Sequence, residues 1–377
     1  MARRSVAVAL LVAPALGLAA LDLAIVAGAS SRPGPPGLGA PSHFALRQAI
    51  AVALGAALGA VVARVGIERV LRRAPLLFVI ALGATAAVFI PGVGVRAAGA
   101  SRWLHLGPLS GSPAPFLIAT TGLLMAAWSG TPDPARGRLA SRPFALALAL
   151  VAALVLVAQP DFSAAAVLLC VAFAALVANG VAGRRLAPAV AVLLVALALG
   201  ASRVGYVGGR IQGFLAPERD RRGHGFEVLT LARSKASGAA GAVGLGHGVA
   251  RRHLSSPASD YVFAIVAEEL GWPGAWAVIA AWAAIAAGAA LAARSTGDGR
   301  RRSVAAACTA ALLAPAALHI AVCRGWTPIV GVTMPFLSYD PALTVASGGE
   351  IGALVAIALA APTPAPATAA TPDGPAA

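Results

Sequence analysis

The sequence predicts an all-α polytopic membrane protein with about ten transmembrane helices, and three observations lead to this fold class. First, 59% of the 377 residues are hydrophobic and 11% are charged, whereas a soluble domain carries about 25% charged residues. Second, the apolar residues gather into long runs, and a helix that crosses a bilayer needs roughly 20 of them. Third, these runs do not alternate between apolar and polar residues, which excludes a transmembrane barrel.

Ten apolar runs are candidates for the spans. They lie near residues 5–29, 43–63, 74–94, 114–130, 143–158, 161–182, 186–202, 261–293, 303–323 and 340–361. The fifth, sixth and seventh are short or closely spaced, so their limits are the least defined. The first run extends over about 25 residues, longer than the hydrophobic region of a signal peptide, so we interpret it as a retained span.

The basic residues predict the orientation. If the N-terminus is cytoplasmic, the inside segments contain 15 of the 29 Lys and Arg residues, and the short outside segments contain five. The inside residues are Arg3, Arg4, Arg64, Arg69, Arg72, Arg73, Arg136, Arg138, Arg142, Arg184, Arg185, Arg294, Arg300, Arg301 and Arg302. This excess of positive charge predicts that both termini lie in the cytoplasm.

The remaining nine basic residues lie in one polar segment, 202–260, between the seventh and eighth spans. We expect it to be a large extracytoplasmic loop, and a loop of this length crosses the membrane largely regardless of its charge. It ends at Asp260, where the eighth hydrophobic run begins. A cationic loop with a carboxylate at the membrane boundary suits a reaction on an anionic, lipid-linked substrate.

The domain organisation follows from these runs. Residues 1–361 are predicted to form a single transmembrane domain, and the Pro-, Ala- and Thr-rich residues 362–377 a disordered cytoplasmic tail. The net charge of +15 does not indicate nucleic-acid binding, because more than half of the basic residues serve as topology signals. The three cysteines, Cys170, Cys308 and Cys323, lie in predicted spans without metal-ligand spacing, so we expect packing roles and no metal site.

Two predicted outward turns carry candidate binding residues. Arg102 and Trp103 follow the third span, where they could bind a substrate or only anchor the chain at the lipid headgroups. Asp161 lies in a tight turn, where it could contact a substrate or cap the next helix by accepting backbone N–H bonds. The sequence leaves both alternatives open.

Three further segments contain polar residues near the membrane. Ser237 lies in a run of small residues, 236–246, that allows a ligand to approach the backbone, or that serves only as a linker. Glu268 and Glu269 lie inside the predicted eighth span, and ionisable residues at that depth default to a functional hypothesis. We expect them to face a protein interior or a water-filled cavity. Ser338 precedes the last span.

Five segments resemble, in this order, the SEDS family (shape, elongation, division and sporulation), whose best-known members are FtsW and RodA. They read GASRWLHLG at 99–107, QPDFSAA at 159–165, ASGAAGAVGLG at 236–246, SDYVFAIVAEELG at 259–271 and PFLSYD at 335–340. The resemblance covers about residues 70–360. Its most specific part is the fourth segment, for which the family pattern is T-D-F-[IV]-F-A-[IV]-x-x-E-E-L-G.

The chain departs from the family pattern at three places. Residues 112–115 read SPAP instead of Q-P-S-E. Residues 254–259 read LSSPAS instead of L-P-E-A-H-T, so the glutamate is missing. The last motif carries Asp340 and Pro341 instead of two glycines. These departures indicate a divergent branch.

The resemblance implies an activity: SEDS proteins polymerise the glycan strands of peptidoglycan. A growing glycan on an undecaprenyl-pyrophosphate carrier is transferred to the sugar of a second lipid-linked disaccharide-peptide (lipid II). The implied catalytic base is Asp260, and a carboxylate with a pKa near 4 needs partial burial to serve as one. The residues expected to bind substrate are Arg102, Trp103, Arg210, Lys235, Ser237 and Asp161. Glu268, Glu269 and Ser338 are expected to support the site.

The resemblance also implies a setting and partners. The protein is expected in the bacterial cytoplasmic membrane, with its active site on the outer face, and beside a class B penicillin-binding protein that crosslinks the product. A divalent cation, Mg²⁺ or Mn²⁺, could help to neutralise the pyrophosphate, although no metal-ligand cluster is legible. Three alternatives stay open: a flippase or transporter that uses Glu268 and Glu269 as coupling groups, a non-catalytic scaffold for a transpeptidase, and a polymerase or ligase of another carrier-linked glycan.

Overall fold

The computed structural model describes residues 2–29, 42–97, 100–106, 109–128, 142–184, 191 and 205–360. The predicted seventh span, 186–202, lies outside the described residues except for position 191. The predicted tail at 362–377 and Gly99 and Gly107 of the first motif also lie outside them.

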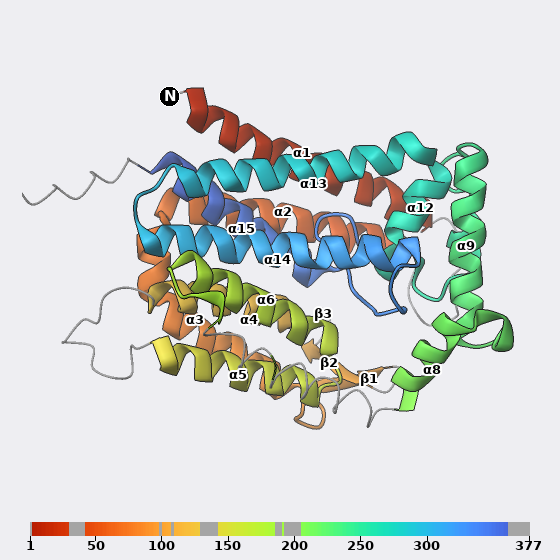
Figure 1. Cartoon of the computed structure of the whole chain (residues 1–377), viewed down its shortest axis with the longest axis horizontal. Coiled ribbons are helices and arrows are strands. Elements are labelled where there is room, and N and C mark those ends of the chain that lie inside the picture. The colour runs from red at the N-terminus through yellow and green to blue at the C-terminus, as the bar shows by residue number, and fades with distance from the viewer. Residues whose placement is uncertain are drawn as a thin grey trace, which may run out of the picture.

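A bundle of apolar helices forms the body of the protein (Figure 1). In the part of the chain that the structure describes, six helices are long and apolar enough to cross a membrane. They are α1 (Ala2–Ala29), α2 (Ser42–Val65), α3 (Ile67–Ala87), α13 (Gly271–Arg294), α14 (Gly299–Arg324) and α15 (Pro341–Leu359). Three shorter apolar helices join them: α4 (Ala114–Ala127), α5 (Arg142–Ala158) and α6 (Phe162–Ala178).

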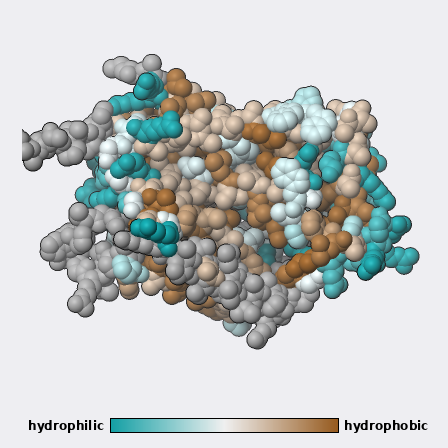
Figure 2. Space-filling model, in the orientation of Figure 1, coloured by the Kyte–Doolittle hydropathy of each residue, from teal (hydrophilic) through white to brown (hydrophobic). Residues whose placement is uncertain are grey.

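The face of the bundle that Figure 2 shows is largely apolar in the middle and polar at its two ends. The N-terminus and the turn between α13 and α14 lie at one end, and α9 (His224–Ala240) lies across the other (Figure 1). A band of apolar surface between two polar ends is the distribution expected of helices that span a bilayer.

The polar segment that the sequence predicts as a long loop is largely helical. It contains α8 (Gly205–Leu215), the short 3₁₀ helix η3 (Pro217–Arg219), α9, α10 (Ala250–His253) and α11 (Pro257–Asp260). A small antiparallel sheet lies at the same end: β1 (Gly94–Ala97), β2 (Ala100–Leu106) and β3 (Leu109–Gly111), in the order β1-β2-β3. The sequence analysis did not predict this sheet.

The predicted continuous helix at 261–293 is wrong. The structure breaks it into α12 (Val262–Glu269) and α13, and Gly271 at the break has φ +66°. Pro273 has no N–H, so it cannot donate to the carbonyl of Glu269 as a continuing helix requires. Instead, the N–H of Gly244 donates to that carbonyl at 3.0 Å. Glu268 and Glu269 therefore lie at the end of a short helix.

The predicted limits of the third span, 74–94, are also wrong, because α3 begins at Ile67 and ends at Ala87. Pro91 cannot donate to the carbonyl of Ala87, which ends the helix there. At the other end, Arg69 lies within α3 although its charge suggested a loop. Long cationic side chains can reach the membrane surface from a helix terminus.

Helices α2 and α15 cross at small residues. A Cβ atom on Gly348 would lie 2.2 Å from the carbonyl oxygen of Gly55, and one on Gly59 would lie 2.6 Å from the carbonyl oxygen of Gly348. Only glycine allows this approach, which is the way small residues pack helices in a membrane. Nearby, the Gln48 amide donates to Asp22 of α1 at 2.5 Å and to Thr344 of α15 at 3.1 Å.

Candidate functional site

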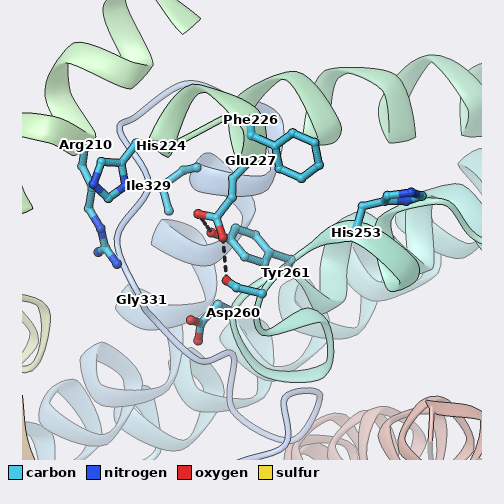
Figure 3. Close-up of a pocket in the computed structure, with 11 residues that line it drawn as sticks. Arg210, His224, Phe226, Glu227, His253, Asp260, Tyr261, Ile329 and Gly331 are labelled. Carbon is cyan, nitrogen blue, oxygen red and sulfur yellow. Dashed lines mark hydrogen bonds between the residues drawn. The ribbon is translucent and has the colours of Figure 1, made fainter. Parts of the chain in front are cut away.

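A cavity of about 370 Å³ opens at the end of the bundle where α8 and α9 lie (Figure 3). Its walls come from α8, α9, the turn 253–261 and the segment 329–331. The lining residues are Arg210, Gly223, His224, Phe226, Glu227, His253, Ser255, Asp260, Tyr261, Ile329 and Gly331. This set contains two carboxylates, one arginine and two histidines, so the cavity is polar and charged.

Asp260 is the last residue of α11 and lines this cavity. The pKa of its carboxyl is raised to about 6, chiefly by burial and to a lesser extent by the negative charge of Glu227. A hydrogen bond to Ser259 and the positive charges of Arg210 and Arg102 act in the opposite direction. A carboxylate with a pKa near 6 is ionised at neutral pH and accepts a proton more readily than an ordinary aspartate.

The turn that carries Asp260 is fastened by the segment before α15. The Ser338 hydroxyl donates to the carbonyl oxygen of Ser259 at 2.7 Å, and the N–H of Tyr339 donates to the carbonyl oxygen of Ala258 at 2.9 Å. Ser338 also accepts from the N–H of Met334 at 2.8 Å, and it is buried. The PFLSYD segment thus holds the backbone next to Asp260.

Glu268 and Glu269 hold the loop before α10. Glu268 accepts from the N–H groups of Val249 and Ala250, both at 2.9 Å. Glu269 forms a bidentate ion pair with Arg251: Nε of Arg251 lies 2.7 Å from Oε1 of Glu269, and Nη2 lies 2.8 Å from Oε2. All three charged side chains are buried, and these donors offset the cost of removing the charges from water.

Arg210 and Arg102 are the predicted arginines that act on Asp260. Arg210 reaches into the cavity from α8 (Figure 3). Arg102, on β2, donates to the carbonyl oxygen of Pro160, and its Nε lies 3.9 Å from Oδ2 of Asp161. Asp161 caps α6 by accepting from the N–H of Ala164 at 3.2 Å. Asp161 therefore makes the helix cap and also pairs with Arg102.

Of the six predicted binding residues, only Arg210 lines this cavity. Trp103 follows Arg102 on β2, so its ring points to the opposite face of the strand, where it is 38% exposed. Lys235 lines a second, apolar cavity of about 150 Å³ with Trp272 and Arg324. Ser237 lies on α9 and lines neither cavity.

Glu227 lines the cavity but is not among the site residues predicted from the sequence. Its carboxylate accepts from the Ser255 hydroxyl at 2.5 Å and from the Tyr261 hydroxyl at 2.9 Å. Of the carboxylates in the polar segment, only Asp260 is predicted from the sequence as a site residue. The available signal was two departures from the family pattern: Ser255 replaces a proline and Tyr261 replaces a phenylalanine.

Asp340 and Pro341, which replace two glycines of the family pattern, begin α15. Asp340 is the N-cap and accepts from the N–H of Leu343 at 3.0 Å, and Pro341 occupies the first helical position. Both residue types are favoured there. Thr333 donates to the other oxygen of Asp340 at 3.1 Å, while burial raises the pKa of this carboxyl. The departure thus supplies a helix cap.

Among the described residues, no group of three or more His, Cys, Asp or Glu side chains is placed to hold a metal ion. In the cavity, each oxygen of Glu227 already accepts one hydrogen bond, from Ser255 or from Tyr261. The described side chains therefore form no ready set of ligands for a protein-bound divalent cation, and we derive no step through one.

The family model of the FtsW, RodA and SpoVE cell cycle proteins matches residues 8–361. The chain is a member of the FtsW/RodA/SpoVE family. It is 32% identical to the protein named "Probable peptidoglycan glycosyltransferase FtsW" of Thioalkalivibrio sulfidiphilus, over 91% of this chain and 87% of the relative. It is 31% identical to the protein of the same name in Aromatoleum aromaticum, over 90% of this chain and 84% of the relative.

Solved structures share the fold of this FtsW/RodA/SpoVE family member. A chain of a peptidoglycan synthase complex that coordinates polymerization and crosslinking superposes with a TM-score of 0.72 at 23% identity, covering 92% of this chain and 96% of that one. The rod-shape-determining protein RodA of Thermus thermophilus superposes with a TM-score of 0.65 at 22% identity, covering 92% of this chain and 95% of RodA. The predicted all-α, multi-pass membrane fold is confirmed.

Proposed function

We propose that this FtsW/RodA/SpoVE family member is a peptidoglycan glycosyltransferase that polymerises a lipid-linked disaccharide-peptide into glycan strands. The observation that carries the proposal is the position of Asp260. It lies in a charged cavity at one polar end of an apolar bundle, and burial raises its pKa to about 6. The names of the FtsW relatives from Thioalkalivibrio sulfidiphilus and Aromatoleum aromaticum support the same activity.

In the proposed reaction, Asp260 takes the proton of the acceptor sugar hydroxyl. The oxygen then bonds to the anomeric carbon of the growing strand as the bond from that carbon to the pyrophosphate oxygen breaks. The pyrophosphate leaves with the electron pair of that bond. Arg210 and Arg102 would offset its charge, because a guanidinium pairs well with phosphate oxygens.

The proposal assigns a different role to each of the other predicted site residues. Asp161 would orient Arg102, Ser338 would hold the backbone next to Asp260, and Glu268 and Glu269 would hold the loop before α10. Trp103, Lys235 and Ser237 would act at a distance from the cavity, on the lipid or glycan parts of the substrate. We further propose that residues 1–361 form one transmembrane domain.

The proposed orientation places both termini in the cytoplasm and the cavity outside the bacterial cytoplasmic membrane. The described basic residues Arg3, Arg64 and Arg300 belong to the same inside set by the positive-inside rule. A class B penicillin-binding protein is the proposed partner. A related chain in a complex that coordinates polymerization with crosslinking supports this partner.

The contacts of Glu268 and Glu269 argue against a transporter that would use them as coupling groups. A coupling carboxylate must exchange its ligand or proton during transport. Here, backbone N–H groups hold Glu268 and the buried guanidinium of Arg251 holds Glu269. Breaking these contacts would leave buried charges without partners, at a cost of several kcal/mol.

A polymerisation assay tests the proposed function. The purified full-length protein, in detergent with the lipid-linked disaccharide-peptide, should form strands that lengthen with time. Arg210→Gln should lower kcat/KM by about ten-fold or more, since it removes a charge-assisted contact, whereas the exposed Arg222→Gln should have little effect. A flippase would give no elongated product in detergent, and a protein that only moves substrate between two sides of liposomes would contradict the proposal.

A further inference from the structure

The cavity contains a second carboxylate, and its contacts differ from those of Asp260. Both oxygens of Glu227 accept hydrogen bonds from hydroxyl groups, at 2.5 Å from Ser255 and at 2.9 Å from Tyr261 (Figure 3). Glu227 belongs to α9, whereas its two donors flank α11, the short helix that ends in Asp260. The carboxylate therefore connects α9 to the turn that carries Asp260.

Tyr261 makes the connection between α9 and this turn rigid. Its side chain is only 2% exposed, and it follows Asp260 directly in the chain. A buried aromatic ring with a hydrogen-bonded hydroxyl has few alternative rotamers. The ring of Tyr261 is held by burial and its hydroxyl by a hydrogen bond. Because Tyr261 is the next residue after Asp260, these contacts also restrict the backbone of Asp260.

We propose that Glu227 is a positioning residue for Asp260: it braces the turn that carries Asp260 and places a fixed negative charge beside it. The inference rests on the proposed function, in which Asp260 takes the proton from the acceptor. It goes beyond that function by assigning a second carboxylate, with two specific hydroxyl donors, to the working of the site.

The residue types on the turn support the inference independently. Both hydroxyl donors stand where the family pattern has residues without a hydroxyl, a proline at Ser255 and a phenylalanine at Tyr261. The glutamate of that pattern is replaced by Ser256. The chain thus lacks that glutamate on the turn and instead holds Glu227 of α9 against the turn.

Other charged and titratable groups also act on Asp260 or line its cavity, and they come from several elements. They are Arg210 of α8, Arg102 of β2, Tyr261, Cys323 of α14, and the cavity residues His224 and His253. The two arginines favour the ionised form of Asp260, and Glu227 opposes them. Removing the charge of Glu227 alone should make Asp260 a weaker base, so its pKa should fall.

The test compares pH profiles of kcat/KM for polymerisation by the full-length protein. At acidic pH, kcat/KM should fall as Asp260 becomes protonated, and this part of the profile is its acid limb. Glu227→Gln should move the acid limb to lower pH by on the order of half a unit, because a like charge beside Asp260 is lost. Glu227→Asp keeps the charge but is too short to hold both hydroxyls, so the limb should stay and kcat should fall. Glu218→Gln is the matched control: it removes an exposed carboxylate of the same segment that pairs with Arg221, and its limb should coincide with that of the native protein.

A profile of Glu227→Gln that coincides with the native one would overturn the inference, and so would an equal shift in Glu218→Gln. If Glu227→Gln does not fold, the double variant with Ser255→Ala and Tyr261→Phe tests the inference instead. It keeps the charge and removes both donors, so kcat should fall by about ten-fold at an unchanged limb. Native kcat in this double variant would overturn the inference.

A second readout separates this inference from the proposed function. Carbon-13 NMR of labelled aspartate gives the pKa of Asp260 without turnover. If the native protein forms no polymer at any pH, the proposed function fails. The inference still stands if Glu227→Gln lowers the pKa of Asp260, and it fails if the pKa is unchanged.

Discussion

The Ser338 hydroxyl donates a 2.7 Å hydrogen bond to the carbonyl oxygen of Ser259, the residue immediately before Asp260. The two serines are 79 positions apart in the chain. The bond joins the segment before α15 to the turn that lines the cavity. The PFLSYD segment, which contains Ser338, thereby supports Asp260, the residue that we propose as the base.

Ser338→Ala should lower both stability and activity. The loss of one buried hydrogen bond costs about 1 kcal/mol of unfolding free energy, and the freed turn should lower kcat by about ten-fold with little change in KM. Thermal unfolding and polymerisation kinetics measure the two effects.

Ser303→Ala is the matched control for this change. The Ser303 hydroxyl also donates a buried bond to a backbone carbonyl, that of Ala175, at 2.8 Å. It should cost similar stability and leave kcat unchanged. Equal losses of kcat in both variants would contradict a specific role for Ser338.

Glu269→Ala should strongly destabilise the protein. It leaves the guanidinium of Arg251 buried without its carboxylate, and such a loss costs about 3–5 kcal/mol. Chemical unfolding in detergent measures it. Glu68→Ala provides the comparison, because Glu68 pairs with Arg301 at 3.0 Å but its side chain is 45% exposed. That exposed pair should contribute at most about 1 kcal/mol, and similar losses for both variants would contradict the structural role of Glu269.

Asp260→Asn should raise the stability of the protein at alkaline pH. Burial raises the pKa of Asp260 from 3.8 to about 6, so the folded state favours the protonated carboxyl. The contribution of Asp260 to stability is therefore full below pH 3.8 and is lost as the pH rises through about 6. The variant removes the ionised group, and its melting temperature should exceed that of the native protein at about pH 8 and approach it only below about pH 4. A difference that does not depend on pH would contradict the raised pKa.

The sequence contained enough information to place Asp260 but not Glu227. Asp260 stands where a polar segment meets an apolar run, and this change in composition is legible along the chain. Glu227 depends on contacts with Ser255 and Tyr261, which are 28 and 34 positions away. No periodicity or spacing predicts such contacts, because they arise only when α9 packs against the turn.

Lys235 illustrates a second limit. It lies on the same helix as Glu227, and eight residues of helix extend about 12 Å. That separation is enough to place the lysine at the apolar cavity beside Trp272. Charge alone therefore did not show which cavity it would reach. The break before α13 was more accessible to prediction, since Gly271 and Pro273 are both visible in the sequence.

The most direct test of the central claim is the polymerisation rate of Asp260→Asn. The amide is nearly the same size as the carboxylate but cannot take up a proton at neutral pH. Asp298→Asn serves as the control, because Asp298 caps α14 by accepting from the N–H of Arg300 at 2.8 Å and asparagine caps equally well. Asp260→Asn should remain folded and lose activity by about 10²-fold or more, while Asp298→Asn should keep the native rate. A folded Asp260→Asn protein that polymerises at the native rate would contradict the account.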